Sequence, residues 1–169
     1  MNAHTDWFAL WVGIGAALGM LQVVRQAPAA RQLDWALAGL GVLASGLLGA
    51  RALYVFLHPQ FYSADPWSAL RLWEGGLSWP GGLLGALLAA LLARFVLEAP
   101  LAVTADRLAP LLIPVAAMCW LGCAAQGCAY GKLLAQDNHW SMPVIDIYGQ
   151  LSYRWPLQYA AAISLVLAI

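Results

Sequence analysis

Charged residues are scarce in this chain. They account for only 9% of its 169 residues, while hydrophobic residues account for 63%. An average soluble domain carries about 25% charged residues, so the shortage excludes an ordinary water-soluble domain and predicts an integral membrane protein. Eight basic and eight acidic residues give a formal net charge of zero. The basic residues are scattered, so nothing in the sequence indicates a nucleic acid partner.

Histidine is missing from the apolar stretches. The three histidines, His4, His58 and His139, fall in tails or connections. Haem ligation would favour histidines inside helices, so this class of protein is not expected. An intramembrane serine protease would need a Gly-x-Ser-Gly-like nucleophile and a helix-borne histidine, and the sequence has neither. We expect no metal and no cofactor.

Cysteine is scarce too, but its three copies lie in one segment. Cys119 and Cys123 are four residues apart and share a helix face, and Cys128 follows soon after. A metal site would require a fourth ligand and tighter spacing. Three interpretations stay open. The cysteines are small apolar core residues, or Cys123 and Cys128 form a disulfide in an oxidising compartment, or these two are reactive thiols that accept an acyl or glyceryl group.

Long apolar stretches dominate what the sequence does contain. They predict helices over residues 7–24, 35–57, 78–96, 108–125 and 157–169. The first four reach the roughly 20 residues that a bilayer-spanning helix needs, whereas the fifth has about 13. The fifth therefore spans the membrane only in part, or the natural chain continues beyond Ile169. We expect a single all-α, polytopic transmembrane domain over residues 1–169.

The connections between these stretches predict an orientation. Residues 1–6 contain no Lys or Arg, and no convincing cleavage site follows, so the first helix is expected to stay in the membrane. Two connections, 58–76 and 126–154, form elaborated arms on the same face. By the positive-inside rule the N-terminus is external. The rule rests here on the four arginines in or beside the other two connections, Arg25, Arg31, Arg94 and Arg107.

Small residues recur four apart within the apolar stretches. Gly15 and Gly19, Ser45 and Gly49, and Gly81 and Gly85 form such pairs. Small residues let helix backbones approach closely, and helix association in lipid depends on such van der Waals contact. The arrays therefore predict tight packing within a helix bundle.

Several motifs carry a resemblance to a known family. They are Gly49-Ala50-Arg51, Gln60-Phe61 with Ala64-Asp65-Pro66, the glycine-rich segment 74–82, Asp106-Arg107-Leu108-Ala109-Pro110, Gly127 with Tyr130-Gly131, and Arg154-Trp155-Pro156-Leu157-Gln158. In order and spacing they resemble prolipoprotein diacylglyceryl transferase, which has Arg-His-Pro-Ser-Gln at the last motif. The resemblance implies that family's fold, shortened or truncated at the C-terminus. It also implies a bacterial inner-membrane location and a diacylglyceryl group moved from phosphatidylglycerol onto a lipobox cysteine.

The departures from the family pattern concern its polar residues. Pro80 stands where the family has a histidine, and Trp120 stands where it has an arginine. The family's two asparagines and its glutamate correspond to Cys123, Gln126 and Cys128. Loss of a proton-transfer group costs about 10²- to 10⁴-fold in rate, and loss of an arginine removes a bidentate phosphate ligand. The catalytic residues are therefore unknown.

The polar groups that remain favour binding of a lipid phosphate. Arg51 lies about six residues from the end of its stretch, a depth at which a cation needs a polar partner. We expect Arg51 and Arg154 to bind a phospholipid phosphate. Ser78, Gly81 and Gly82 would add the N–H groups of a helix start. Snorkelling of the arginines, ion pairing of Arg51 with Asp65 or Glu74, and ordinary helix capping are the alternatives.

These features lead to two hypotheses about function. The first is a diverged, non-catalytic member that binds phospholipid, with phosphatidylglycerol suspected, or that serves as a subunit beside other membrane proteins. The alternative is an active phosphatidylglycerol-dependent lipid transferase in lipoprotein biosynthesis with a rebuilt catalytic set. Turnover with phosphatidylglycerol and a lipobox peptide would separate the two.

Overall fold

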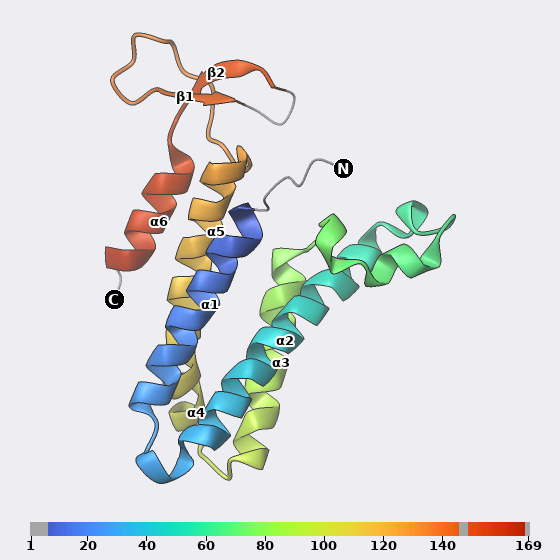
Figure 1. The fold of residues 1–169 in the computed structure, drawn as a ribbon, viewed down its shortest axis with the longest axis vertical. Helices are drawn as coiled ribbons and strands as arrows, with labels where there is room; N and C mark the ends of the chain where they lie inside the picture. Colours follow the sequence, from blue (N-terminus) through green and yellow to red (C-terminus); the bar gives the residue numbers. More distant parts are fainter. Residues whose placement is uncertain (1–6, 146–148, 168–169) are drawn as a thin grey trace. The chain divides into compact units, whose positions relative to one another are not determined.

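The protein is mostly helical, as the sequence predicts. The computed structural model describes residues 7–145 and 149–167, and Figure 1 shows long helices with one small hairpin. The helices are α1 (Trp7–Gln26), α2 (Gln32–Leu57), α3 (Trp79–Val96), α4 (Leu101–Leu108), α5 (Leu112–Gln126) and α6 (Leu157–Leu167). The strands are β1 (Met142–Ile145) and β2 (Leu151–Arg154), paired antiparallel.

Within the described residues, four helical segments are long and apolar enough to cross a membrane. They are Trp7–Gln26, Ala29–Leu57, Trp79–Val96 and Leu101–Gln126, and Leu157–Leu167 is a shorter apolar helix. The predicted all-α polytopic membrane fold is confirmed. Residues 168–169 of the predicted fifth stretch lie outside the described residues.

One helix extends further than expected. The fourth stretch was predicted to begin at residue 108, but the helical segment begins at Leu101, with α4 and a 3-10 turn (Ala109–Leu111) preceding α5. Hydropathy alone missed α4 because Asp106 and Arg107 interrupt its apolar residues. Its Thr104 and Leu108 are buried, so α4 packs one face and exposes the other. A short amphipathic helix is the kind of element that mean hydropathy overlooks.

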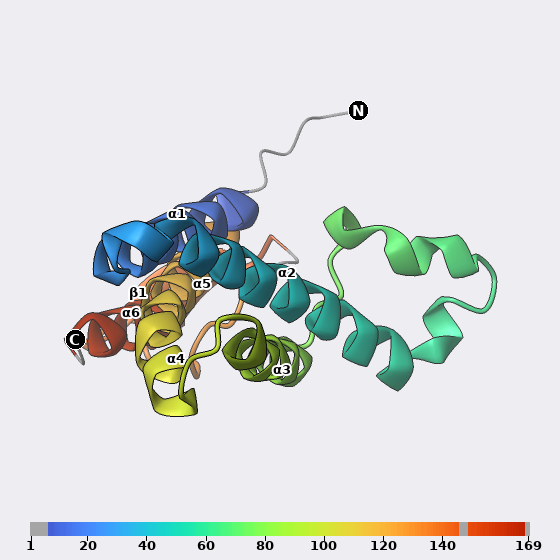
Figure 2. The same ribbon diagram turned by 90° about the horizontal axis from the view of Figure 1, so that it is seen from below.

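The chain divides into two compact units, one of residues 23–108 and one of residues 1–22 with 109–169. We call them the α2–α3 unit and the α5–α6 unit. In the α2–α3 unit, α2 and α3 lie side by side along their length (Figures 1 and 2). In the α5–α6 unit, α5 packs against α6. It also receives α1, because Gly15 and Gly19 lie against Pro114 and Leu111.

The α2–α3 contact depends on glycines at the predicted small-residue positions. A Cβ at Gly49 would lie 2.5 Å from the carbonyl oxygen of Gly81, and a Cβ at Gly85 would overlap the carbonyl oxygen of Ser45. At these positions backbone therefore meets backbone. This is the close approach that small residues permit in lipid, and it confirms the packing expected of these arrays.

The arm of residues 58–76 is built from short 3-10 turns. The turns span Pro59–Phe61, Pro66–Leu70 and Leu72–Glu74. Pro59 and Pro66 occupy first-turn positions, where a missing N–H does no harm. The side chain of Asp65 accepts a hydrogen bond from the Trp67 N–H and caps the second turn. Pro66 has no N–H that could bond back to the carbonyl four residues earlier, so no continuous α-helix runs from Pro59 through Pro66.

We predict that Gly85→Ala weakens the α2–α3 unit. The added methyl group would meet the backbone of Ser45, which cannot rotate away, and overpacking of this kind costs about 1–3 kcal/mol. Gly41→Ala in α2 is the matched control, since its Cβ would meet nothing within 4 Å. It should be neutral or stabilising by up to about 1 kcal/mol. Unfolding by heat or SDS in detergent micelles measures both, and equal stability of the two variants would contradict the prediction.

Candidate functional site

Arg51 is the most heavily hydrogen-bonded side chain of the α2–α3 unit. It lies in α2 and is only 6% exposed. Its Nε donates to the carbonyl of Ala69 at 2.8 Å, and its Nη2 donates to the carbonyls of Ser68 and Arg71 at 2.7 and 3.1 Å. Its Nη1 donates to the carbonyl of Gly76 at 3.2 Å and also to that of Gly75. The guanidinium thus meets five backbone oxygens, all of them in the arm.

This arrangement changes the role expected of Arg51. A guanidinium has five N–H donors, and the five carbonyl contacts engage them all. The sequence interpretation assigned these donors to a lipid phosphate, or to an ion pair with Asp65 or Glu74. The structure instead pairs both carboxylates with Arg71, each at 3.2 Å. A phosphate could reach Arg51 only by displacing carbonyls of the arm.

The start of α3 packs against α2. The backbone N–H of Ser78 donates to the carbonyl of Ala50 at 3.0 Å, and its side chain makes no capping hydrogen bond. The N–H of Gly82 donates to the carbonyl of Ser78 at 3.0 Å, and Gly81 is buried beside Gly49. The anion-binding role predicted for these three residues therefore has no unengaged N–H at Ser78 or Gly82.

Arg154 has a different environment, in the α5–α6 unit. It ends β2, and its Cζ lies 4.2 Å from the centroid of the Tyr130 ring. Its Nε donates to the hydroxyl of Ser152 at 2.8 Å, and its Nη1 makes a long 3.4 Å contact to the carbonyl of Gly131. Within residues 7–145 and 149–167, these contacts engage two of its five N–H groups. The tyrosine ring and the strand fix the position of the guanidinium.

A second basic residue, Lys132, and two tryptophans lie in or next to the arm of residues 126–154, which ends at Arg154. Lys132 is exposed, and its carbonyl accepts from the N–H of Trp155, the residue after Arg154, at 3.0 Å. The rings of Trp140 and Trp155 lie 5.5 Å apart. Basic and indole side chains together are typical of the membrane interface, where headgroup phosphates are found. The sequence interpretation named Arg154 as a site residue but not Lys132 or Tyr130, although Tyr130 belongs to one of the motifs that carry the family resemblance.

Cys123 and Cys128 form a disulfide at the end of α5, with their Cα atoms 4.7 Å apart. Gly127 ends the helix with φ of +68°, and the N–H of Cys128 returns to the carbonyl of Cys123 at 2.9 Å. Of the interpretations left open by the sequence, the structure has the disulfide. In this form neither sulfur is a nucleophilic thiol. Cys119 is free.

The disulfide turn is joined to α6 by a buried polar contact. Gln158 is 3% exposed, and its Nε2 donates to the carbonyl of Cys128 at 2.8 Å. Gln158 belongs to the motif that contains Arg154, so one short segment holds both the guanidinium and the disulfide turn. A buried amide that lost this partner would pay a desolvation penalty of about 1–3 kcal/mol.

Groups suited to proton transfer are not gathered at the family motif. Pro80 lies in the first turn of α3 and Trp120 lies within α5. His58 is stacked on Tyr54 at 4.4 Å, and its Nδ1 lies 3.1 Å from that residue's carbonyl oxygen. Within residues 7–145 and 149–167, no cluster of three His, Cys, Asp or Glu side chains could hold a metal ion.

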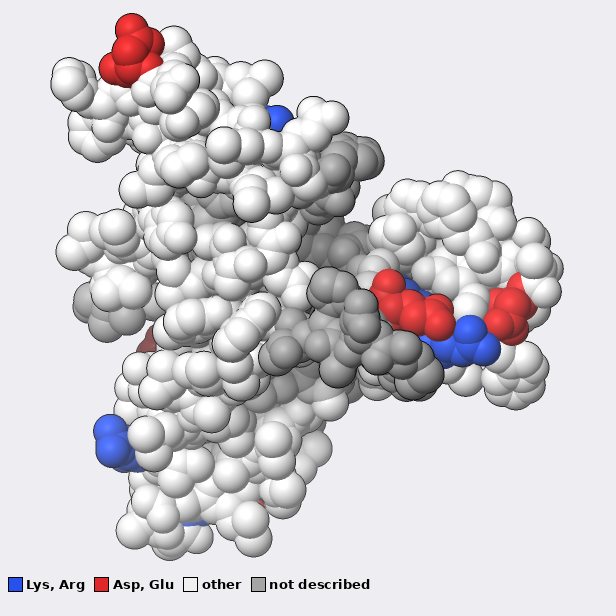
Figure 3. Space-filling model, turned by 45° about the horizontal axis from the view of Figure 1, so that its top comes forward, with Lys and Arg blue, Asp and Glu red and all other residues white. Residues whose placement is uncertain are grey.

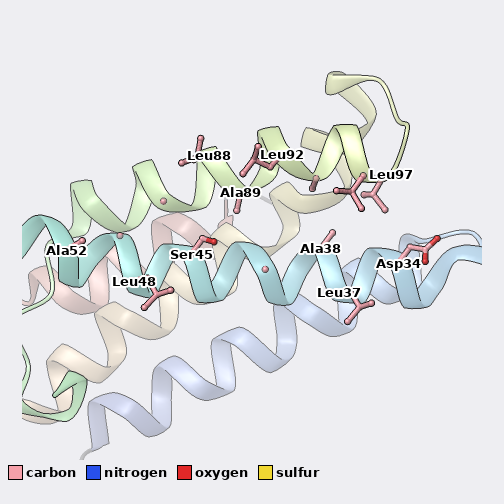
Figure 4. A pocket seen from close by; sticks show the side chains of 15 residues that line it. Asp34, Leu37, Ala38, Ser45, Leu48, Ala52, Leu88, Ala89, Leu92 and Leu97 are labelled. Carbon is pink, nitrogen blue, oxygen red and sulfur yellow. The ribbon is translucent and has the colours of Figure 1, made fainter. Parts of the chain in front are cut away.

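A long apolar groove of about 680 Å³ runs along α2 and α3 (Figure 4). Leucine, alanine and glycine dominate its lining. Its charged lining residue, Asp34, lies near one end and pairs with Arg31 at 3.2 Å. The sequence predicted close packing at Ser45, Gly49 and Gly85, but not that these residues would also leave an open groove. Small side chains on both helices are the signal that could have indicated it.

We predict that the protein isolated without reductant carries one free thiol. Denatured and treated with a maleimide–polyethylene glycol reagent, it should gain one adduct, at Cys119, and three adducts after reduction. Cys128→Ser should lower stability by about 2 kcal/mol, as expected for a short disulfide loop, whereas Cys119→Ser serves as the control that keeps the disulfide. Three adducts before reduction would contradict the assignment.

Comparison with known proteins places these features in a family. The family model described as prolipoprotein diacylglyceryl transferase matches residues 1–169. A phosphatidylglycerol–prolipoprotein diacylglyceryl transferase from Polynucleobacter asymbioticus is 36% identical over 140 residues, covering 76% of this chain and 51% of its own length. The enzyme from Verminephrobacter eiseniae is 34% identical over 120 residues, covering 70% of this chain and 43% of its own length.

A similar relative with a shorter match comes from Thermoanaerobacter sp. (strain X514). It carries the same enzyme name and is 36% identical over 88 residues, covering 50% of this chain and 34% of its own length. The chain thus spans about half or less of the length of these curated relatives. With the family model matching from end to end, the chain belongs to the prolipoprotein diacylglyceryl transferase family.

Proposed function

We propose that this chain is a non-catalytic member of its family that binds an anionic phospholipid through Arg154. The observation that carries the proposal is the guanidinium of Arg154 seated over Tyr130, with two of its five donors engaged by Ser152 and Gly131. A phosphate accepts paired hydrogen bonds from such a planar donor group. Lys132, exposed beside it on the arm, would add a second positive charge.

The side chains at the family's motif positions suit headgroup binding better than a reaction. Transfer of a diacylglyceryl group to a thiol requires a proton to leave that thiol, and a general base usually accepts it. At the family's motif positions this chain has Pro80, Trp120 and a disulfide between Cys123 and Cys128. A proline ring, an indole and a disulfide sulfur do not accept a proton near neutral pH. Binding without turnover is the function that this set of side chains supports.

Acyl chains have a suitable surface in the α2–α3 unit. Its groove of about 680 Å³ is apolar along most of its length, and it lies between two membrane-spanning helices. In the hydrocarbon region such a groove takes up methylene chains without leaving polar groups unpaired. We therefore assign lipid tails to this groove and a lipid headgroup to Arg154, as two separate features of a lipid-binding protein.

The proposed location is the bacterial inner membrane, with an external N-terminus. Arg31, Arg94 and Arg107 belong to one end of the α2–α3 unit, where Arg31 donates to the carbonyl of Leu97 at 2.9 Å and Arg107 lies 4.9 Å from the ring of Trp35. Clustered arginines at the ends of spanning helices favour the cytoplasmic side. The two arms would then lie on the outer side, where a disulfide between Cys123 and Cys128 is stable.

We predict that phosphatidylglycerol binding depends on Arg154. The protein in detergent micelles should retain phosphatidylglycerol in preference to phosphatidylcholine, measured by native mass spectrometry during lipid titration. Arg154→Ala should weaken retention about tenfold or more, since hydrogen bonds to charged groups contribute about 1.5–3 kcal/mol. The matched control is Arg94→Ala, which removes an arginine that lies over the Phe95 ring in the last turn of α3. Equal retention by both variants would contradict the proposal.

Transferase activity is the second measurement. With phosphatidylglycerol and a lipobox peptide, we expect no diacylglyceryl product above the level of a protein-free control. Product formation that Arg154→Ala abolishes and Arg94→Ala does not would overturn the non-catalytic assignment. It would instead establish the chain as a lipid transferase with a different catalytic set.

A further inference from the structure

We propose that the arm of residues 58–76 is immersed in the lipid interface, with Phe61, Trp67 and Leu70 in contact with phospholipid, and that Arg51 holds it there. The partner is the phospholipid surface itself, and the residues involved are not those of the headgroup site proposed at Arg154. The inference does not depend on that site. It follows from the depth of Arg51, the satisfaction of the arm's carbonyls and the exposure of its apolar side chains.

Arg51 lies well inside α2, and the arm reaches back to it. Arg51 lies six residues before Leu57, the end of α2, which is roughly 9 Å along a helix that rises 1.5 Å per residue. Its guanidinium nevertheless bonds to carbonyls from Ser68 to Gly76. The later half of the arm must therefore fold back beside the last turns of α2. The 3.0 Å hydrogen bond from the Ser78 N–H to the Ala50 carbonyl fixes the end of the arm at the same level.

The backbone carbonyls of the arm need hydrogen-bond donors. Short 3-10 turns leave several carbonyls without intrahelical partners, and lipid offers no donors to satisfy them. Arg51 supplies five donors to five such carbonyls. The hydroxyl of Ser68 donates to the Asp65 carbonyl at 2.6 Å as well. Irregular backbone is tolerated at membrane depth where the protein itself satisfies it, and this segment meets that condition.

Large apolar side chains of the arm are exposed. Phe61, Trp67 and Leu70 are 64%, 74% and 66% exposed. The charged side chains of the arm are instead grouped, with Arg71 bridging Asp65 and Glu74 at 3.2 Å each. Figure 3 shows acidic and basic groups side by side on the arm, next to uncharged surface. An arm with one charged side and exposed large apolar side chains is the pattern of a segment that lies in an interface.

Lipid is the occupant favoured by the connectivity of the arm. Both of its ends continue directly into spanning helices, at Leu57 of α2 and Trp79 of α3. The arm therefore begins and ends at the bilayer boundary, and Arg51 draws its later half toward the bilayer. Indole rings prefer that region, and Trp79 at the start of α3 is 79% exposed. A phospholipid surface covers these side chains without any further protein.

The test uses spin labels on the full chain in vesicles of phosphatidylethanolamine and phosphatidylglycerol. In a Cys119→Ala background, which leaves no free cysteine among the described residues, single cysteines are placed by Trp67→Cys, Leu70→Cys and Glu74→Cys. Labels at 67 and 70 should collide more with oxygen than with a water-soluble nickel chelate. The label at 74, on the charged side, should show the reverse order.

Two results would overturn lipid contact. Labels at 67 and 70 that favour the nickel chelate as much as the label at 74 would place these side chains in water. Labels at 67 and 70 that neither reagent reaches would indicate burial against protein. Both results leave the phosphatidylglycerol titration of Arg154 unaffected, so failure here and failure of the proposed function can be told apart.

The role of Arg51 is tested by Arg51→Lys with the Leu70→Cys label. Lysine keeps the charge but offers three donors from a single nitrogen in place of the planar five, so the arm should loosen. In Arg51→Lys we expect the label at 70 to lose its preference for oxygen. A label at Trp67→Cys should lose that preference too. Arg94→Lys is the matched control and should change neither label. An unchanged profile in Arg51→Lys would overturn the holding role. The labels in the Arg51 protein still test lipid contact if that variant fails to fold.

Discussion

The structure of the α2–α3 unit depends on one buried cation. The guanidinium of Arg51 donates to five carbonyls of residues 68–76, which would otherwise need water as their partner. Without it, a proline-interrupted arm could not fold back along α2, since its carbonyls would lack donors. The cation in turn avoids the penalty of an unpaired intramembrane charge, because five carbonyl dipoles and the Tyr62 ring at 5.3 Å surround it. Arm and arginine therefore stabilise each other.

Helix contacts and polar chemistry place different demands on the residues of this chain. The glycines that bring α2 and α3 into backbone contact, Gly49 and Gly85, leave no room for a Cβ. Positions at which the family has polar groups instead hold Pro80 and Trp120, together with a disulfide. Packing constraints are satisfied by shape alone, whereas proton transfer needs particular functional groups. The packing of the helices therefore places no demand on the polar groups at those positions.

The two arginines of the sequence interpretation illustrate how far that interpretation reaches. Arg51 was identified as a cation whose depth in its helix requires a polar partner, and Arg154 was identified through the family motif. The partners could not be derived, because the carbonyls that surround Arg51 come from 17 to 25 residues further along the chain. Arg154 lies over Tyr130, which is 24 positions earlier. The position of a buried cation in the sequence indicates that it needs hydrogen-bond partners. The sequence does not identify these partners when they are backbone atoms.

By itself the sequence determined the solvent of this protein, the approximate extent of its spanning helices and the small-residue faces on which they pack. These properties follow from local composition and from the period of the helix. Only the tertiary structure decided the donors that Arg51 gives to the arm, the pairing of Cys123 with Cys128 and the groove left between α2 and α3. The physical reason is that hydrogen bonds, disulfides and voids depend on the distance between residues remote in the chain. Those distances are set by how the helices pack, which no single stretch of sequence contains.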